Sequence, residues 1–269
     1  MADAGPAHDA VVLAAMPEEL APLRALLADA RPVACRGFGV DIDIVTGRLG
    51  ANRVALAVTG DGDRNARLRA AAVLALAPAR ALLAIGVAGA LSEDLVPGDL
   101  IAVTRVVRER GPLLAANPQL ADAAAGHGAR AGVAVTADRI ADTVVEKQRL
   151  LAIAAGCVGA DGSGGAGTAA VVDLESAAYA EAAIAARIPW LILRAVSDTA
   201  AEALPALLNH ARDAGGAVRR GRVVAGLLRD PSALPRLLGL RRRVSACAEA
   251  LARGAARVIA LSALDRQLR

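Results

Sequence analysis

Residues 190–200, WLILRAVSDTA, form an almost unbroken apolar run that ends abruptly in Ser197 and Asp198. A run this apolar is typical of a strand in the middle of a sheet. The end of such a strand is an unfavourable place for a carboxylate, because burial without a partner destabilises a charged group. Asp198 is therefore either the cap of a following helix or a carboxylate held there for chemistry.

Similar apolar runs recur along the chain and alternate with segments of helical spacing. This alternation predicts an α/β sandwich, with ligands expected near the strand ends. At 269 residues the chain suits one large domain, predicted over residues 1–230. The expected strands are 10–15, 40–47, 53–60, 81–86, 98–107, 132–137, 169–175 and the opening stretch; the expected helices are 17–28, 65–76, 143–155 and 175–186.

Two segments differ in composition from this pattern. The glycine-rich stretch GCVGADGSGGAGT, residues 156–168, is predicted to be a flexible loop with little structure of its own. Residues 231–269 are predicted to form helices, because apolar side chains recur at helical spacing with arginines on the other faces.

Charge is concentrated at the C-terminal end of the chain. Residues 219–269 contain twelve arginines and three acids, a net charge of +9 in a chain whose total is +4. One interpretation is a helix packed on the body with its arginines in solvent. The other is a peripheral membrane contact, because each arginine near an anionic surface contributes about 1 kcal/mol.

Composition excludes several classes of function. The chain has one Trp, one Tyr and one Phe, too few aromatic rings for a platform on which single-stranded nucleic acid stacks. The three cysteines are far apart, and no Cys/His cluster suggests a metal site. The first ten residues contain no apolar signal core. We therefore expect a cytoplasmic protein with free thiols, no metal and no nucleic-acid partner.

Chemistry-bearing residues gather at the predicted strand ends. Each of four stretches joins an apolar strand to a glycine turn or a carboxylate, which would bring several acids to one rim of the sheet. Neighbouring buried carboxyl groups have pKa values that are pushed apart, as acid–base catalysis requires. The stretches are AAMPEEL (14–20), IGVAGAL (85–91), VVDLESAA (171–178) and RAVSDTA (194–200).

Together, in this order and spacing, the four motifs resemble the nucleoside phosphorylase superfamily, above all its methylthioadenosine/S-adenosylhomocysteine nucleosidase branch. The resemblance covers residues 10–200. It implies a three-layer α/β/α sandwich whose central sheet is mixed and partly barrel-like, followed by C-terminal helices. It also implies a small-molecule nucleoside as substrate, no cofactor, and a homodimer or larger homo-oligomer.

The tail segment LLRDPSALPRLLGLRRR and the serine in VDLES resemble a subfamily, the hopanoid-associated phosphorylases. That resemblance implies cleavage of adenosylhopane, a lipid-linked adenine nucleoside, at the inner face of the membrane. Methylthioadenosine, S-adenosylhomocysteine and futalosine remain alternative substrates.

The resemblance implies a role for each matching residue. Asp198 corresponds to the acid that protonates N7 of adenine, and Glu19 to the base that orients the attacking water. Glu175 corresponds to the carboxylate that binds the ribose hydroxyls, and Leu174 replaces a methionine beneath the sugar. The remaining substrate-binding residues are Gly86, Val87 and Ala88 at the pocket floor, with Asp173 and Ser197 beside the main carboxylates.

Departures from the family pattern leave the nucleophile open. True phosphorylases hold phosphate with an arginine and a serine near the glycine turn, where this chain has Ala84 and Val87. Phosphate is possible as a co-substrate through Arg36, Arg64 or an arginine of a second subunit, but the residues favour water. An aromatic residue to stack on adenine is also not evident, with Phe38 and Tyr179 the two candidates. A non-catalytic, membrane-associated relative is the alternative.

Several charged residues have a simpler interpretation. Glu18 is expected to stabilise a helix N-terminus through the helix dipole. The histidines His8, His127 and His210 are expected at the surface without a role, and Lys147, the single lysine, is expected to be solvated.

Overall fold

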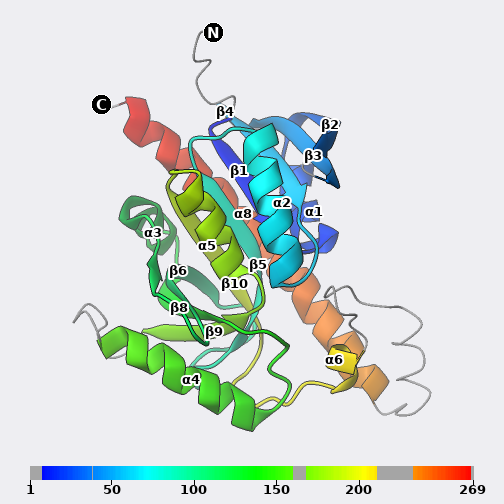
Figure 1. Ribbon diagram of the computed structural model, residues 1–269, viewed down its shortest axis with the longest axis vertical. Coiled ribbons are helices and arrows are strands. Elements are labelled where there is room, and N and C mark those ends of the chain that lie inside the picture. The colour runs from blue at the N-terminus through cyan, green and yellow to red at the C-terminus, as the bar shows by residue number, and fades with distance from the viewer. Residues whose placement is uncertain (1–7, 38, 160–167, 211–232, 268–269) are drawn as a thin grey trace.

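The computed structural model describes residues 8–37, 39–159, 168–210 and 233–267 (Figure 1). The strands are β1 (Ala10–Ala14), β2 (Ala28–Gly37), β3 (Val40–Leu49), β4 (Asn52–Val58), β5 (Leu82–Ala90), β6 (Leu100–Arg108), β7 (Leu114–Ala115), β8 (Arg130–Thr136), β9 (Ala169–Asp173) and β10 (Trp190–Asp198). The helices are α1 (Pro17–Ala25), α2 (Asp63–Leu76), α3 (Pro118–Ala125), α4 (Val144–Gly159), α5 (Ser176–Ala185), α6 (Leu207–His210) and α8 (Ala233–Gln267).

The central sheet is closed at one end and open at the other. Strand β5 pairs with both β10 and β9, and the circuit continues from β10 through β6 and β8 back to β9, so these five strands form a closed barrel. Along the same edge as β9 but at its N-terminal end, β5 also pairs with β1, from which β4, β3 and β2 extend as an open sheet. Pairing is mixed, because β1, β4, β5 and β10 run parallel whereas β6 and β9 are antiparallel to their neighbours β10 and β5.

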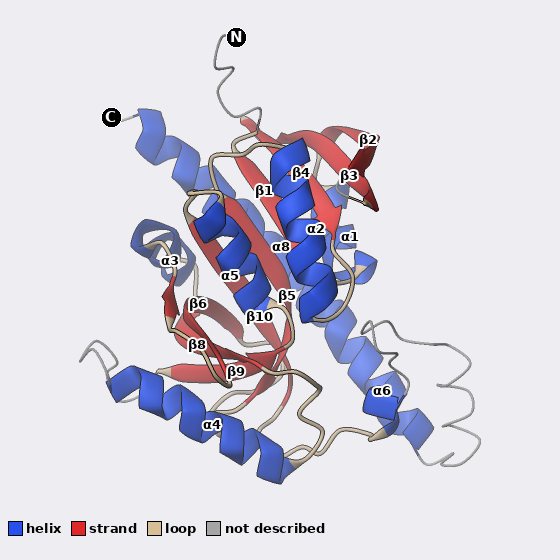
Figure 2. Cartoon of the chain, viewed as in Figure 1, coloured by secondary structure: helices blue, strands red, loops and turns tan. Residues whose placement is uncertain are grey.

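Helices cover both faces of this sheet, as Figure 2 shows. Helices α2 and α5 pack together on one face, while α1 and α8 pack together on the other, and α4 lies against β8 and β9. The prediction of a mixed, partly barrel-like sheet between helices is therefore confirmed. The opening strand β10 lies at the centre of the molecule and is buried along its whole length, as its apolar sequence requires.

Besides the short elements β7 and α6, two longer elements were not expected from the sequence. Strand β2 has the polar sequence ADARPVACRG, which shows no clear alternation, and it forms because it pairs with β3 at the edge of the open sheet. Helix α3 begins at Pro118, and the side chain of Asn117 accepts a hydrogen bond from the Leu120 amide as its N-cap. Both rest on local pairing or capping, signals that hydrophobic periodicity does not detect.

The glycine-rich segment differs from its prediction at its start. Residues 156–159 continue α4 rather than beginning a loop. Residues 160–167 lie outside the described part of the chain.

The basic C-terminal segment forms one 35-residue helix that packs on the body. Cys247, Leu251, Ala255 and Val258 are buried in the cluster formed by the inner faces of β1, β5 and β10, while arginines such as Arg253 face solvent. The division of the chain at residue 230 stays a prediction. Among the described residues, no helix combines the length and apolar character needed to cross a bilayer.

Candidate active site

A pocket of about 250 Å³ opens where the C-terminal ends of β1, β5, β9 and β10 meet. Because β1, β5 and β10 run parallel, residues that follow these strands emerge at the same edge of the sheet. The pocket wall contains every predicted site residue except Gly86. Its lining is Ala15, Met16, Glu19, Asp61, Val87, Ala88, Gly89, Ile140, Ala141, Val172, Asp173, Leu174, Glu175, Ser197, Asp198, Leu204, Leu208, Leu240 and Val244.

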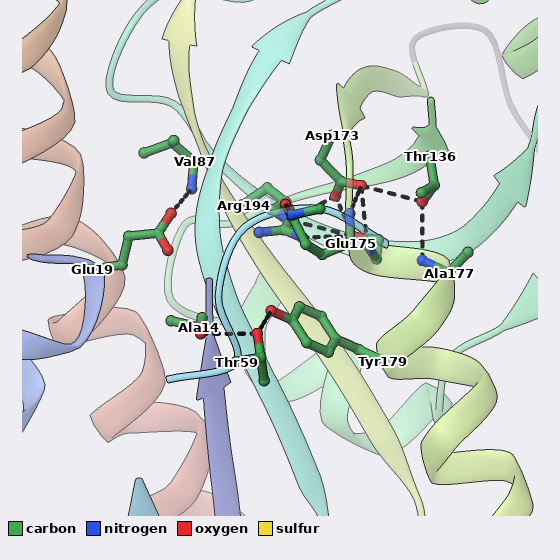
Figure 3. A network of polar contacts seen from close by, with 12 residues as sticks. Ala14, Glu19, Thr59, Val87, Thr136, Asp173, Glu175, Ala177, Tyr179 and Arg194 are labelled. Atoms are coloured by element: carbon green, nitrogen blue, oxygen red, sulfur yellow. Dashed lines mark hydrogen bonds and ion pairs between the residues drawn. The ribbon is translucent and has the colours of Figure 1, made fainter. Parts of the chain in front are cut away.

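Glu19 is fixed in the first turn of α1 with its carboxylate turned inward. One carboxylate oxygen accepts a hydrogen bond from the Val87 amide at 3.0 Å (Figure 3), and the other accepts one from the Met16 amide at 2.9 Å. Burial raises the pKa of Glu19, and Arg194 and the two amides only partly oppose this effect. The neighbouring Glu18 is exposed, in line with its simpler role at the helix terminus.

Arg194 is fully buried next to the pocket, and its positive charge partly offsets the negative charge of the neighbouring acids. Its Nε lies 2.7 Å from Asp173 Oδ2, and its Nη2 lies 3.9 Å from Glu175 Oε2 and 3.0 Å from the Ser176 hydroxyl (Figure 3). A Cβ on Gly86 would stand 2.1 Å from Arg194 Nη1. Gly86 therefore contributes space for the guanidinium rather than a wall of the pocket.

Glu175 follows β9 and is held between two loops. Its Oε1 accepts a hydrogen bond of 2.7 Å from the amide of Gly62, which has a φ of 86°. Burial raises the pKa of Glu175 well above its usual value; Arg194 lowers it, whereas Asp173 and Asp61 raise it further. A carboxyl group in this position can accept or donate a hydrogen bond to a sugar hydroxyl.

Asp173 lines the pocket, but most of its hydrogen-bonding capacity is used within the fold. It accepts hydrogen bonds from the Ser176 amide at 3.1 Å, the Thr136 hydroxyl at 3.2 Å and the Ser176 hydroxyl, and it pairs with Arg194 (Figure 3). These contacts fix the start of α5 and the guanidinium of Arg194. The structure thus places Asp173 mainly as a support for its neighbours.

Asp198 reaches the pocket because β10 is irregular at its end. The register with β5 shifts between Val196 and Asp198, and such a bulge re-aims a side chain next to a site. The Ser197 hydroxyl lies 2.6 Å from Asp198 Oδ1. A Cβ on Gly89 would stand 3.1 Å from Asp198 Oδ2, so this glycine leaves room for the carboxylate.

The expectation that Lys147 is solvated is wrong. Its side chain is 1% exposed, and its Nζ lies 2.5 Å from Asp198 Oδ2. The sequence alone suggested an isolated carboxyl at the end of an apolar strand. Instead, Asp198 is one half of a buried ion pair. The one sequence feature that could have drawn attention to Lys147 is its type, because it is the single lysine in a chain that otherwise uses arginine.

The other pocket residues form an apolar wall that the sequence did not indicate. Leu204 and Leu208 come from the segment that follows β10, and Leu240 and Val244 come from α8. The C-terminal helix thus belongs to the pocket as well as to the core. Asp61, from the TGDGD turn after β4, adds a further acid to the wall.

The candidates for phosphate binding and for stacking on adenine do not line the pocket, as far as the structure describes them. Tyr179 is fully buried, with its hydroxyl 2.7 Å from that of Thr59 (Figure 3), and Arg64 is absent from the wall. Phe38 and the side chain of Arg36 lie outside the described part. Within the described ranges, no group of three or more His, Cys, Asp or Glu residues could hold a metal ion.

A family model described as the phosphorylase superfamily matches residues 9–230, most of the chain and all of the strands that build the pocket. The chain belongs to the phosphorylase superfamily. The resemblance inferred from the four strand-end motifs is thereby confirmed at the level of the superfamily.

Matches to individual curated proteins cover a smaller part of the chain than the family model does. A 5′-methylthioadenosine/S-adenosylhomocysteine nucleosidase of Mycobacterium bovis is 38% identical over 103 residues, which is 38% of this chain and 39% of the relative. The match therefore spans well under half the length of that curated relative.

Solved structures share the fold over almost the whole chain. The S-adenosylhomocysteine nucleosidase of Streptococcus pyogenes, solved with 5-methylthiotubericidin, gives a TM-score of 0.70 at 20% identity, covering 98% of this chain and 99% of that one. The futalosine hydrolase of Helicobacter pylori gives a TM-score of 0.70 at 17% identity, covering 94% and 97%. At these identities the likeness establishes the fold.

Proposed function

We propose that this protein is an enzyme that cleaves the N-glycosidic bond of an adenine nucleoside with water. The observation that carries the proposal is a single pocket with three buried carboxyl groups in three different settings. Glu19 is held by two amides, Glu175 lies near a buried guanidinium, and Asp198 pairs with a buried ammonium. Groups whose surroundings separate their acid–base behaviour are suited to separate acid and base roles.

Each carboxyl group matches one need of the reaction. Cleavage passes through an oxocarbenium-like state, which carboxylates beside the sugar stabilise. Asp198 would give a proton to N7 so that adenine leaves, and Glu175 would bind the ribose hydroxyls. Glu19 would orient and deprotonate the attacking water; its raised pKa brings a carboxylate base closer to neutral pH.

The charge of the pocket wall favours water over phosphate. Glu19, Asp61, Asp173, Glu175 and Asp198 all line the pocket, and the described lining contains no arginine, lysine or histidine. Arg194 lies below the wall and is already paired with Asp173. A phosphate anion would therefore meet like charges, whereas a water molecule requires only a hydrogen-bond acceptor.

The substrate class is best supported by the relatives and by the apolar wall. The named relatives act on methylthioadenosine, S-adenosylhomocysteine or futalosine, and an apolar 5′ substituent suits a wall formed by Leu204, Leu208, Leu240 and Val244. The same wall keeps adenosylhopane as a second candidate, because a triterpenoid substituent is apolar. Assembly into a homo-oligomer and membrane contact through α8 remain predictions attached to these candidates.

One experiment tests the reaction, the nucleophile and the substrate together. The protein is incubated with methylthioadenosine, S-adenosylhomocysteine, futalosine, adenosylhopane or inosine, with and without phosphate, and the free base is separated by chromatography. We expect adenine from a 5′-thio nucleoside at a rate that does not depend on phosphate. Strict dependence on phosphate would overturn hydrolysis, and no free base from any substrate would favour the non-catalytic relative.

A further inference from the structure

The ammonium group of Lys147 donates three hydrogen bonds, one to Asp198 and two to backbone carbonyl groups that follow it. Its Nζ lies 2.5 Å from Asp198 Oδ2, 2.6 Å from the Thr199 carbonyl oxygen and 3.0 Å from the Glu202 carbonyl oxygen. A lysine ammonium has three N–H donors, so these three acceptors use its full capacity. The tetrahedral point charge of lysine fits this cage, whereas the planar fork of an arginine does not match three converging oxygens.

The contact reaches Asp198 from outside the pocket. Asp198 and Ser197 line the pocket, but Lys147 is not part of its wall. Helix α4 carries Lys147 and packs on the barrel strands β8 and β9, so the ammonium approaches the end of β10 from the barrel side. Lys147 therefore touches the proposed acid but does not line the pocket that would hold a nucleoside.

We propose that Lys147 is a positioning residue that fixes Asp198 and stabilises its carboxylate as the proton passes to adenine; this rests on the proposed function. The C1′–N9 bond breaks, its electron pair goes to the adenine, and the proton moves from Asp198 to N7. Asp198 becomes a carboxylate in that step, beside an ammonium that is already in place. A preorganised opposite charge of this kind stabilises the transition state without reorganisation. Solvent returns the proton to Asp198 after adenine leaves.

A purely structural role is the competing explanation, because Lys147 also tethers residues 199–202 through two carbonyl groups. The two roles differ in their dependence on the leaving group. In a 4-nitrophenyl riboside the C1′–O bond breaks and 4-nitrophenolate leaves with the electron pair. Because this leaving group needs no proton, its release does not need Asp198 as an acid. A structural defect lowers both reactions, whereas loss of Lys147 as a positioning residue lowers adenine release alone.

The test compares Lys147→Met with wild type on methylthioadenosine and on 4-nitrophenyl β-D-riboside. The matched control is Arg243→Met, because Arg243 holds the same segment through Glu202 at 2.6 Å without touching Asp198. We expect Lys147→Met to lower kcat for adenine release by roughly 100-fold, the lower range for one positioned acid, while release of nitrophenolate stays within about threefold. Arg243→Met should change neither rate by more than about threefold, as expected for a partly exposed pair.

Each further outcome has a fixed meaning. Parallel loss of both activities, or adenine release by Lys147→Met within threefold of wild type, overturns the positioning role. Wild-type protein that releases no adenine from any nucleoside overturns the proposed function instead. In an Asp198→Asn background, added Lys147→Met should not lower kcat further, and an additional fall would show that Lys147 does not act through Asp198.

Discussion

Two buried cationic side chains, Arg194 and Lys147, contact acids of the pocket, and the number of acids around each differs. Arg194 lies among Asp173, Glu175 and Glu19, whereas in the described part of the chain Lys147 pairs with Asp198 alone. One guanidinium cannot offset three buried carboxylates, so the pKa values of Glu19 and Glu175 are raised by burial despite it.

This difference separates the two halves of the proposed reaction. The Arg194 side contains carboxyl groups whose pKa values are raised by burial, which strengthens a carboxylate as a base for water. The Lys147 side contains one carboxyl group that faces one buried ammonium. Variants that remove one member of either cluster therefore have different expected consequences, which are largest at Asp198.

Replacing Asp198 with Asn should have the largest effect. Adenine release from a 5′-thio nucleoside should fall by roughly 10³-fold, because the leaving base loses its acid. The variant also leaves the Lys147 ammonium buried without its partner, so the free energy of unfolding in urea should fall by about 3–5 kcal/mol. The double variant with Lys147→Met should recover stability but not activity, and a single variant with activity within tenfold of wild type would contradict the assignment.

Replacing Glu19 with Gln should abolish the base while leaving its volume. We expect a loss of about 100-fold in kcat, with the exposed Glu18→Gln as a matched control of unchanged activity. In wild type, the rate should rise with pH as Glu19 loses its proton.

The ionisation of Glu19 should also change the stability of the folded protein with pH, in a direction that its raised pKa fixes. The pKa of Glu19 is raised in the folded protein, so its stabilising contribution is present at low pH and is lost as pH rises through that folded value. The melting temperature of Glu19→Gln relative to wild type should therefore increase between pH 5 and pH 9. A relative melting temperature that decreases over this range would show that Glu19 ionises more readily when folded.

Replacing Gly86 with Ala tests the space for Arg194. The new Cβ would stand 2.1 Å from Nη1, so the guanidinium must move and the unfolding free energy should fall by about 1–3 kcal/mol. Gly156→Ala is the control, because a Cβ there meets nothing within 4 Å and the residue lies in α4. That control should stabilise the helix by up to about 1 kcal/mol. Equal effects of the two substitutions would contradict the conclusion that Gly86 leaves space for the guanidinium of Arg194.

Replacing Leu240 with Ala should have the smallest effect, because it touches neither cluster. The KM for methylthioadenosine should rise by about tenfold while that for adenosine changes little, since the lost contact is to the 5′ substituent. Leu238→Ala serves as the control, because Leu238 lies on the same helix and is 48% exposed. Equal KM changes for both nucleosides would show that Leu240 does not contact that substituent.

The fold and most acids of the site could be predicted, because their signals lie within short stretches. Apolar runs identified eight of the ten described strands, because these runs alternate with segments of helical spacing or form the β3–β4 hairpin. The two-residue β7 and the polar edge strand β2 lack that signal. The carboxylates followed from their positions at strand ends, since parallel strands bring such ends together.

The partners of those carboxylates could not be predicted. Lys147 meets Asp198 across 51 residues, and the contact depends on how α4 packs on the barrel. Leu240 and Val244 reach the pocket only because α8 continues as one helix across the body. Long-range packing of this kind has no local pattern, and helical spacing around Lys147 fits a solvated face equally well.

The single lysine makes the native molecule unusually suited to covalent footprinting. Amine-acylating reagents modify lysine, and here the one side chain of this type is buried with its three donors occupied. Acylation at residue 147 would thus require local opening of the segment that holds Asp198. Its rate, followed by mass spectrometry with and without a nucleoside, would measure how firmly a ligand closes that part of the protein.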